Sequence, residues 1–140
     1  MSHNMFRKRT KGRIIWENAP DIKKRILKIV SHIDLSWLKT SSLHCFRSRN
    51  SASRAYARIW GLSKIWQLAL NLNPSYVIEV LSERFDRLPM SDQDKVLLHE
   101  IAHIPKNFSG SLLPHVRRRG KRNFEDRVEE LFAQYLRKLK

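Results

Sequence analysis

Residues 91–105 read SDQDKVLLHEIAHIP, and this segment carries the strongest pattern in the 140-residue chain. On a helix, His99 and His103 lie four residues apart and therefore project from the same face, where two imidazoles can bind one zinc ion. Glu100 follows the first histidine directly, within reach of a water molecule that the metal would activate. The segment therefore predicts a zinc-binding helix that also carries a general base.

Local signals on either side of the motif predict where this helix begins and ends. Ser91 and Asp94 have the Ser-x-x-Asp spacing of an N-terminal cap, and Pro105 disfavours helical geometry at the residue before it. We expect a helix from about Ser91 to His103, with both histidines near its C-terminal end. Its apolar residues recur at three- and four-residue steps and should face a core: Leu97, Ile101 and Ile104.

An open zinc site needs a third protein ligand, and the sequence offers two kinds. His115 follows a turn-rich connection containing Gly110 and Pro114, which could bring it back over the end of the helix. Alternatively, a carboxylate of the final helix completes the site; the candidates are Glu125, Glu129 and Glu130. Three protein ligands leave the fourth position for water, as catalytic zinc sites do. The only cysteine, Cys45, argues against a structural zinc site built from thiolates.

Six short stretches between Ser53 and His115 follow one family pattern: ARI at 57–59, YVIEV at 76–80, FDRL at 85–88, HEIAHIP at 99–105, FSG at 108–110 and LPH at 113–115. In these stretches the chain resembles small zinc metallopeptidases of archaea and phages, which are related to the SprT-like proteases. The resemblance implies a zincin fold and one Zn²⁺ ion per chain. It also implies that His99, His103 and His115 are the metal ligands and that Glu100 is the general base.

Periodicity places further elements around the motif. Pro20 and Asp21 open an N-terminal helix with an isoleucine-rich stripe, and a C-terminal helix runs from Asn123, a plausible N-cap, to about Leu139. Strands are expected at 43–47, 55–60, 64–70 and 76–81, although Gln, Leu and Ala would also suit a helix at 64–70. We expect the 76–81 strand to lie along the cleft and to hold an extended substrate by main-chain pairing.

These elements predict a single α+β domain, a minimal zincin. It would have an N-terminal helix, a small twisted and mainly antiparallel sheet of three or four strands, the metal-binding helix and a C-terminal helix. Residues 1–13 are polar and basic and are expected to form a flexible segment ahead of a domain at 14–140. Cys45 is expected to be a small buried residue without chemistry of its own.

The charge of the chain is its second signal. Lysine and arginine number 28 against 13 acidic residues, a formal net charge of +15, which favours an anionic partner such as DNA or another nucleic acid. A basic cluster follows His115 closely and would lie beside the cleft, where it could bind phosphates. Its members are Arg117, Arg118, Arg119, Lys121 and Arg122.

Together these patterns predict a zinc-dependent metallopeptidase that hydrolyses peptide bonds, with DNA-associated proteins as the favoured substrates. One alternative is a basic nucleic-acid-binding protein whose metal site is structural or vestigial. Another is a metal-dependent hydrolase that cleaves a different bond. No apolar run is long enough to span a membrane and no signal peptide is visible, so we expect a cytoplasmic protein without a membrane partner; a lone cysteine is compatible with that compartment.

Overall fold

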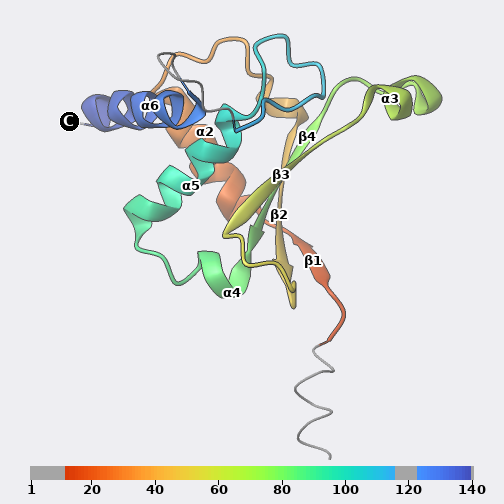
Figure 1. Ribbon diagram of the computed structural model, residues 1–140, viewed down its shortest axis with the longest axis horizontal. Coiled ribbons are helices and arrows are strands. Elements are labelled where there is room, and N and C mark those ends of the chain that lie inside the picture. Colours follow the sequence, from red (N-terminus) through yellow and green to blue (C-terminus); the bar gives the residue numbers. More distant parts are fainter. Residues whose placement is uncertain (1–11, 116–122, 140) are drawn as a thin grey trace, which may run out of the picture.

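The computed structural model describes residues 12–115 and 123–139, so the predicted basic cluster at 117–122 and most of the predicted flexible segment lie outside the described residues. The elements follow the order β1 (Ile15–Asn18), α2 (Pro20–Ser31), a 3₁₀ turn (Thr40–Ser42), β2 (Leu43–Arg49), β3 (Ala57–Gly61), α3 (Lys64–Leu70), β4 (Tyr76–Leu81), α4 (Ser82–Phe85), α5 (Met90–Ala102) and α6 (Phe124–Leu139). Figure 1 shows α2, α5 and α6 on one side of the sheet and α3 projecting from the other end of the molecule.

Within the described residues the strands form one four-stranded sheet in the order β1-β2-β4-β3. The β2–β4 pairing is parallel, whereas β1–β2 and β3–β4 are antiparallel. The predicted α+β class, the mainly antiparallel sheet and the two terminal helices are therefore confirmed.

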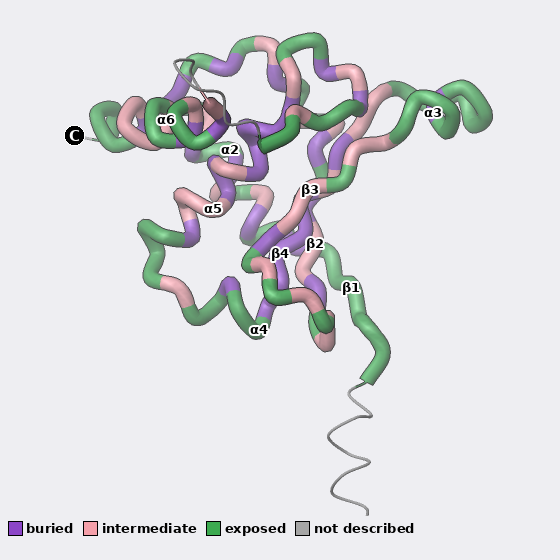
Figure 2. Tube along the Cα trace, viewed as in Figure 1, coloured by how far each residue is buried: buried purple, intermediate pink, exposed green. Residues whose placement is uncertain are grey.

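The core lies between the sheet and the helices that cover it. In α2 the predicted isoleucine stripe is buried at Ile22, Ile26 and Ile29, and each fully buried side chain of this size contributes about 1.5–3 kcal/mol to folding. Figure 2 shows the same burial along β4 and the second half of α5. Cys45 is buried in this core, as expected, and burial raises the pKa of its thiol to about 11. No described helix has the length and apolar character needed to cross a bilayer.

Two predictions of secondary structure were wrong. The segment expected as a strand at 64–70 is the helix α3, because its helix-favouring residues have no neighbouring strand to pair with; Asn71 ends it in the left-handed conformation (φ 57°). Helix α5 begins at Met90 after Pro89, so Ser91 lies inside the helix instead of capping it. Strand β1 was not predicted, because all four of its residues are exposed and only its pairing with β2 defines it.

The predicted role of the 76–81 strand in holding substrate was also wrong. Strand β4 pairs with β2 on one side and with β3 on the other, so its main chain has no free edge for a peptide. The exposed edge on that side of the sheet belongs to β3. Sequence alternation identifies strands, but their order depends on non-local pairing.

Candidate metal centre

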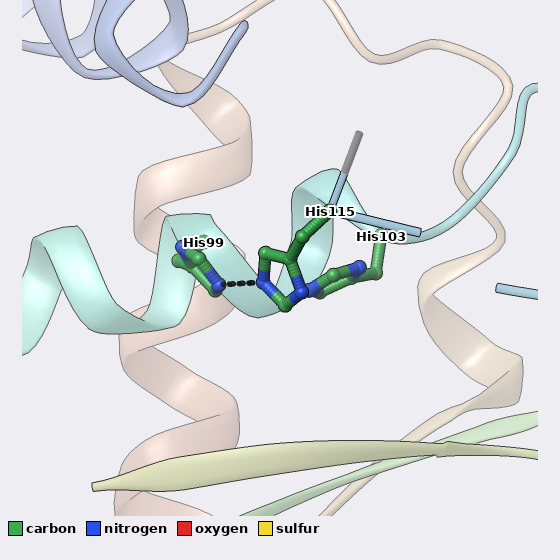
Figure 3. A group of neighbouring side chains, drawn as sticks. All are labelled: His99, His103 and His115. Carbon is green, nitrogen blue, oxygen red and sulfur yellow. Dashed lines mark hydrogen bonds between the residues drawn. The ribbon is translucent and has the colours of Figure 1, made fainter. Parts of the chain in front are cut away.

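The two histidines of the motif leave the C-terminal end of α5 on the same side. His99 lies in the last turn, and His103 is the C-cap residue with near-helical geometry (φ −73°, ψ −13°), so the four-residue spacing still aligns them. Their ring centroids are 5.2 Å apart. Figure 3 shows both rings directed toward His115, which comes from the segment after the helix.

The loop between α5 and His115 is anchored on the sheet. Gly110 adopts φ 99°, and a Cβ at the neighbouring Gly61 would come within 2.0 Å of its carbonyl oxygen, so both positions require glycine. The Gly110 amide donates to the Tyr76 hydroxyl (2.8 Å), which donates to the Ser111 carbonyl (2.8 Å). The side-chain amide of Gln67 donates to the Ser109 carbonyl (2.8 Å). These contacts direct the chain back toward the end of α5.

Two hydrogen bonds between His103 and Leu113 fix the returning chain. The Leu113 amide donates to the His103 carbonyl (2.7 Å), and the His103 ring nitrogen Nδ1 donates to the Leu113 carbonyl (2.5 Å). Because a carbonyl can only accept, Nδ1 carries the proton and Nε2 of His103 keeps its lone pair. The same pair of bonds places His115 two residues away from an anchored position.

The three imidazoles converge on one point. Nε2 of His99 and Nε2 of His115 are 2.9 Å apart, and a nitrogen from each of the three rings lies within 4.8 Å of the others. Two nitrogens on a tetrahedral zinc, each about 2.0–2.1 Å from the metal, lie about 3.4 Å apart. The Nε2–Nε2 spacing of His99 and His115 is about half an ångström shorter than that separation, so a small outward movement of the rings would let the cluster hold a metal ion.

The charge state of the cluster suits a cation. Burial, followed by the nearby positive charge of His103, lowers the pKa of His99. Burial also lowers the pKa of His103, and this outweighs the opposite effect of its hydrogen bond to Leu113. The lowered pKa of each ring favours its neutral form, which offers a lone pair to a metal.

Glu100 lies beside the cluster in a buried position. Its side chain has no hydrogen bond or ion pair within residues 12–115 and 123–139, and burial raises the pKa of this carboxyl to about 8 in the metal-free chain. With its pKa raised this far, the carboxyl is mostly protonated at neutral pH, and its ionised form is costly unless a nearby cation stabilises it. Its position therefore points to a role in the same site as the histidines.

Helix α6 contributes one residue, Phe124, whose contact with this centre the sequence did not indicate. The ring of Phe124 stacks on His103 (centroids 4.2 Å apart) and also contacts His99 (5.0 Å) and His115 (4.8 Å). The predicted N-cap Asn123 is confirmed: its side chain accepts from the Asp126 amide (3.1 Å), and Asp126 accepts in return from the Asn123 amide (3.1 Å). A phenylalanine in an apolar helical stripe carries no signal that distinguishes it from a core residue.

The predicted alternatives for the third ligand lie elsewhere. The Glu125 carboxylate is 3.9 Å from Nδ1 of His99, on the ring atom opposite the one that faces His115. Glu129 forms an ion pair with Lys95 (2.5 Å). Among the described residues, the group that could hold a metal contains His115 with the two histidines of the motif, and it includes none of Glu125, Glu129 and Glu130.

Two hollows meet at the cluster. One of about 450 Å³ lies between β3, α5 and α6, and one of about 400 Å³ lies between β3 and the segment before His115. Both are lined by Ala57, His99 and Glu100, so together they form a cleft that follows the β3 edge past the histidines.

Comparison with known proteins gives one match. A family model described as "Putative phage metallopeptidase" matches residues 14–137, which is most of the chain. No curated protein and no solved structure matches the chain. The match confirms the resemblance to small phage metallopeptidases, while the relation to SprT-like proteases stays a prediction.

Proposed function

We propose that this chain, which belongs to the phage metallopeptidase family, is a zinc-dependent peptidase with His99, His103 and His115 as the zinc ligands and Glu100 as the general base. The observation that supports this most is the convergence of three imidazoles beside a buried, unpaired carboxylate in one cleft. Family membership and the histidine cluster already indicate a metal-dependent peptidase; the identity of the metal and the roles of the residues are the proposal.

The residues present fit zinc. Neutral imidazoles are good ligands for zinc, and the hydrogen bond from Nδ1 of His103 leaves Nε2 directed away from the protein backbone. Three histidines leave one coordination position open, which distinguishes a catalytic zinc site from a structural one. We therefore expect one zinc ion per chain.

When bound, zinc would acidify a water molecule and polarise the carbonyl of the scissile peptide bond. Glu100 accepts the proton from that water on a carboxylate oxygen as the water oxygen forms a bond to the carbonyl carbon. The same carboxyl group then gives the proton to the amine as the carbon–nitrogen bond breaks. A bound cation would stabilise the ionised form of Glu100 and lower its pKa, so the carboxylate would be available as the base.

The substrate would bind as an extended peptide along β3. This strand has a free edge within the described residues, and its residue Ala57 lines both hollows of the cleft. A peptide that pairs with an exposed edge gains main-chain hydrogen bonds regardless of its sequence. The edge of β3 thus takes the role that the sequence suggested for the 76–81 strand.

Zinc content and cleavage test this proposal together. The chain is purified without added metal, and its zinc is measured beside that of His115→Ala and of the control His44→Ala, which removes an exposed histidine from β2. We expect about one zinc per chain in the wild type and the control, a much weaker affinity in His115→Ala, and hydrolysis of an unfolded protein that a chelator stops and zinc restores. Zinc binding without any peptide hydrolysis would instead favour a vestigial site or a different bond.

DNA-associated proteins in the cytoplasm are the proposed substrates, on the basis of the +15 net charge. A basic protease would be concentrated on DNA by its charge, and the gain would fall steeply with salt. Cleavage of a DNA-binding protein should therefore be faster with DNA present at low salt than at high salt. Equal rates with and without DNA would remove this substrate class and leave the peptidase intact.

A further inference from the structure

Helix α3 is the most exposed apolar element in the described part of the chain. At least half of the surface of each of its large side chains, and of Leu72 just beyond it, is exposed: Ile65 70%, Trp66 57%, Leu68 66%, Leu70 55% and Leu72 50%. We call these five residues the α3 knob. Figure 2 shows α3 exposed along its length, and Figure 1 shows it projecting away from the rest of the molecule.

Helix α3, which carries the knob, is attached to the rest of the protein through Gln67. Gln67 is the one buried residue of α3, and its side-chain amide donates to the carbonyls of Leu62 and Ser109, both at 2.8 Å. The polar group of the helix thus faces inward while the apolar groups face outward, the reverse of an ordinary surface helix. A helix that is apolar around most of its circumference is normally buried in a protein core or in a membrane.

The charged residues in the sequence around the knob are basic. Residues 35–78 contain no aspartate or glutamate. The pairing register places Leu43, Gly61 and Tyr76 at the same end of the sheet, so the exposed Lys39, four residues before β2, and Lys64, at the start of α3, belong to that end. An apolar projection that begins with Lys64, at an end of the sheet where residues 35–78 supply no carboxylate, matches an anionic lipid surface, where apolar side chains enter the interface and lysines meet the head groups.

We propose that the α3 knob inserts into the surface of an anionic lipid bilayer and attaches the protein to it peripherally. α3 is far too short to span the bilayer, so this contact differs in kind from the spanning segment whose absence the sequence indicated. DNA could satisfy the lysines but not the five apolar side chains. A second copy is a weaker fit, because five partly exposed side chains alone fall short of the roughly 800 Å² per partner that a stable interface buries.

Vesicle sedimentation tests the proposal. The full chain is mixed with vesicles of phosphatidylcholine alone or with added phosphatidylserine, beside Trp66→Asp/Leu68→Asp and the control Leu136→Asp/Leu139→Asp. The control makes the same charge change on α6 at side chains that are 43% and 44% exposed. We expect wild type and control to bind the phosphatidylserine vesicles at least about 10-fold more tightly than the knob variant does. Phosphatidylcholine alone should bind weakly.

Fluorescence gives a second readout that does not depend on a disruptive variant. Tryptophan emission should shift to the blue on adding phosphatidylserine vesicles, and most of the shift should be absent in Trp66→Phe. Glu100→Gln should bind vesicles as the wild type does, so this test is independent of the peptidase proposal. The proposal is overturned if the wild type does not sediment with the vesicles, or if the knob variant sediments equally well. It is also overturned if the knob variant, without lipid present, loses a dimer that the wild type forms or loses peptide cleavage.

Discussion

Of helices α3 and α5, the one with the more apolar sequence is the more exposed to solvent. α3 reads KIWQLAL and is the more apolar, yet every residue except Gln67 is exposed. α5 reads MSDQDKVLLHEIA and carries six charged or imidazole groups and amides, yet it buries Leu97, Leu98 and Ile101 together with Glu100. Apolar composition therefore does not determine burial in this protein; the presence of a covering surface does.

The covering surfaces explain the difference. α5 packs against β3, α2 and α6, so its apolar side and its catalytic candidates are enclosed together. α3 is an excursion between two neighbouring strands of a hairpin and is tied down through Gln67. The first helix builds a chemical site in the interior, and the second presents an apolar surface to the outside.

The largest expected effect concerns the buried carboxylate of α5. Glu100→Gln keeps the shape of the side chain but removes its ability to accept a proton, so peptide hydrolysis should fall by about 10²–10⁴-fold with zinc content unchanged. The measurement is kcat for a peptide substrate beside zinc per chain, with the exposed Glu17→Gln as the control. Activity near wild type would show that Glu100 is buried for another reason.

Truncating one apolar side chain in each helix tests the comparison directly. Ile101→Ala should lower the free energy of unfolding by about 2–5 kcal/mol, because Ile101 is fully buried. Leu68→Ala should change it by less than about 0.5 kcal/mol, because Leu68 is 66% exposed. Denaturant unfolding of both variants provides the values. Equal losses would mean that α3 packs against something in the folded chain.

A smaller effect is expected where α6 meets α5. Phe124→Leu should weaken zinc binding by about 10-fold, because the leucine cannot stack on His103 and hold the three rings in place. Phe132→Leu on the same helix is the control, since that ring contacts Tyr135 and Lys95 away from the histidines. Competition with a fluorescent chelator measures the zinc affinities. Equal affinities for both variants would mean that Phe124 is a core residue that does not hold the three imidazoles in place.

The smallest effect is a pH dependence that arises from Glu79 in strand β4. Burial would raise the pKa of Glu79, but hydrogen bonds from Arg58 (3.0 Å) and Trp60 (2.8 Å) outweigh it and lower that pKa below the ordinary 4.5. A lowered pKa stabilises the fold above pH 4.5, and this stability is lost as the pH falls through the folded-state value. Glu79→Gln should therefore unfold with a shallower pH dependence in this acidic range than wild type, as thermal melts would show. Identical slopes would contradict this assignment.

Local signals in the sequence were sufficient for the metal-binding helix and for α6. The motif places His99 and His103 by helical spacing alone, and Asn123 caps α6 through a contact three residues away. Non-local facts were not accessible. The edge position of β3 and the contact of Phe124 with all three imidazoles depend on how distant segments pair, whereas the helix at 64–70 was the alternative that its own residues favoured. The choice between His115 and a glutamate stayed open for the same reason.

The position of Phe124 has a consequence for the order in which the protein matures. During synthesis the chain emerges from its N-terminus, so the strands and α5 are available before the residues that complete the metal centre. His99 and His103 can then form a two-histidine pair, while His115 and the stacking ring of Phe124 arrive only with the later segments. A nascent chain would therefore lack the third imidazole, and the three-histidine cluster would be complete only once α6 docks.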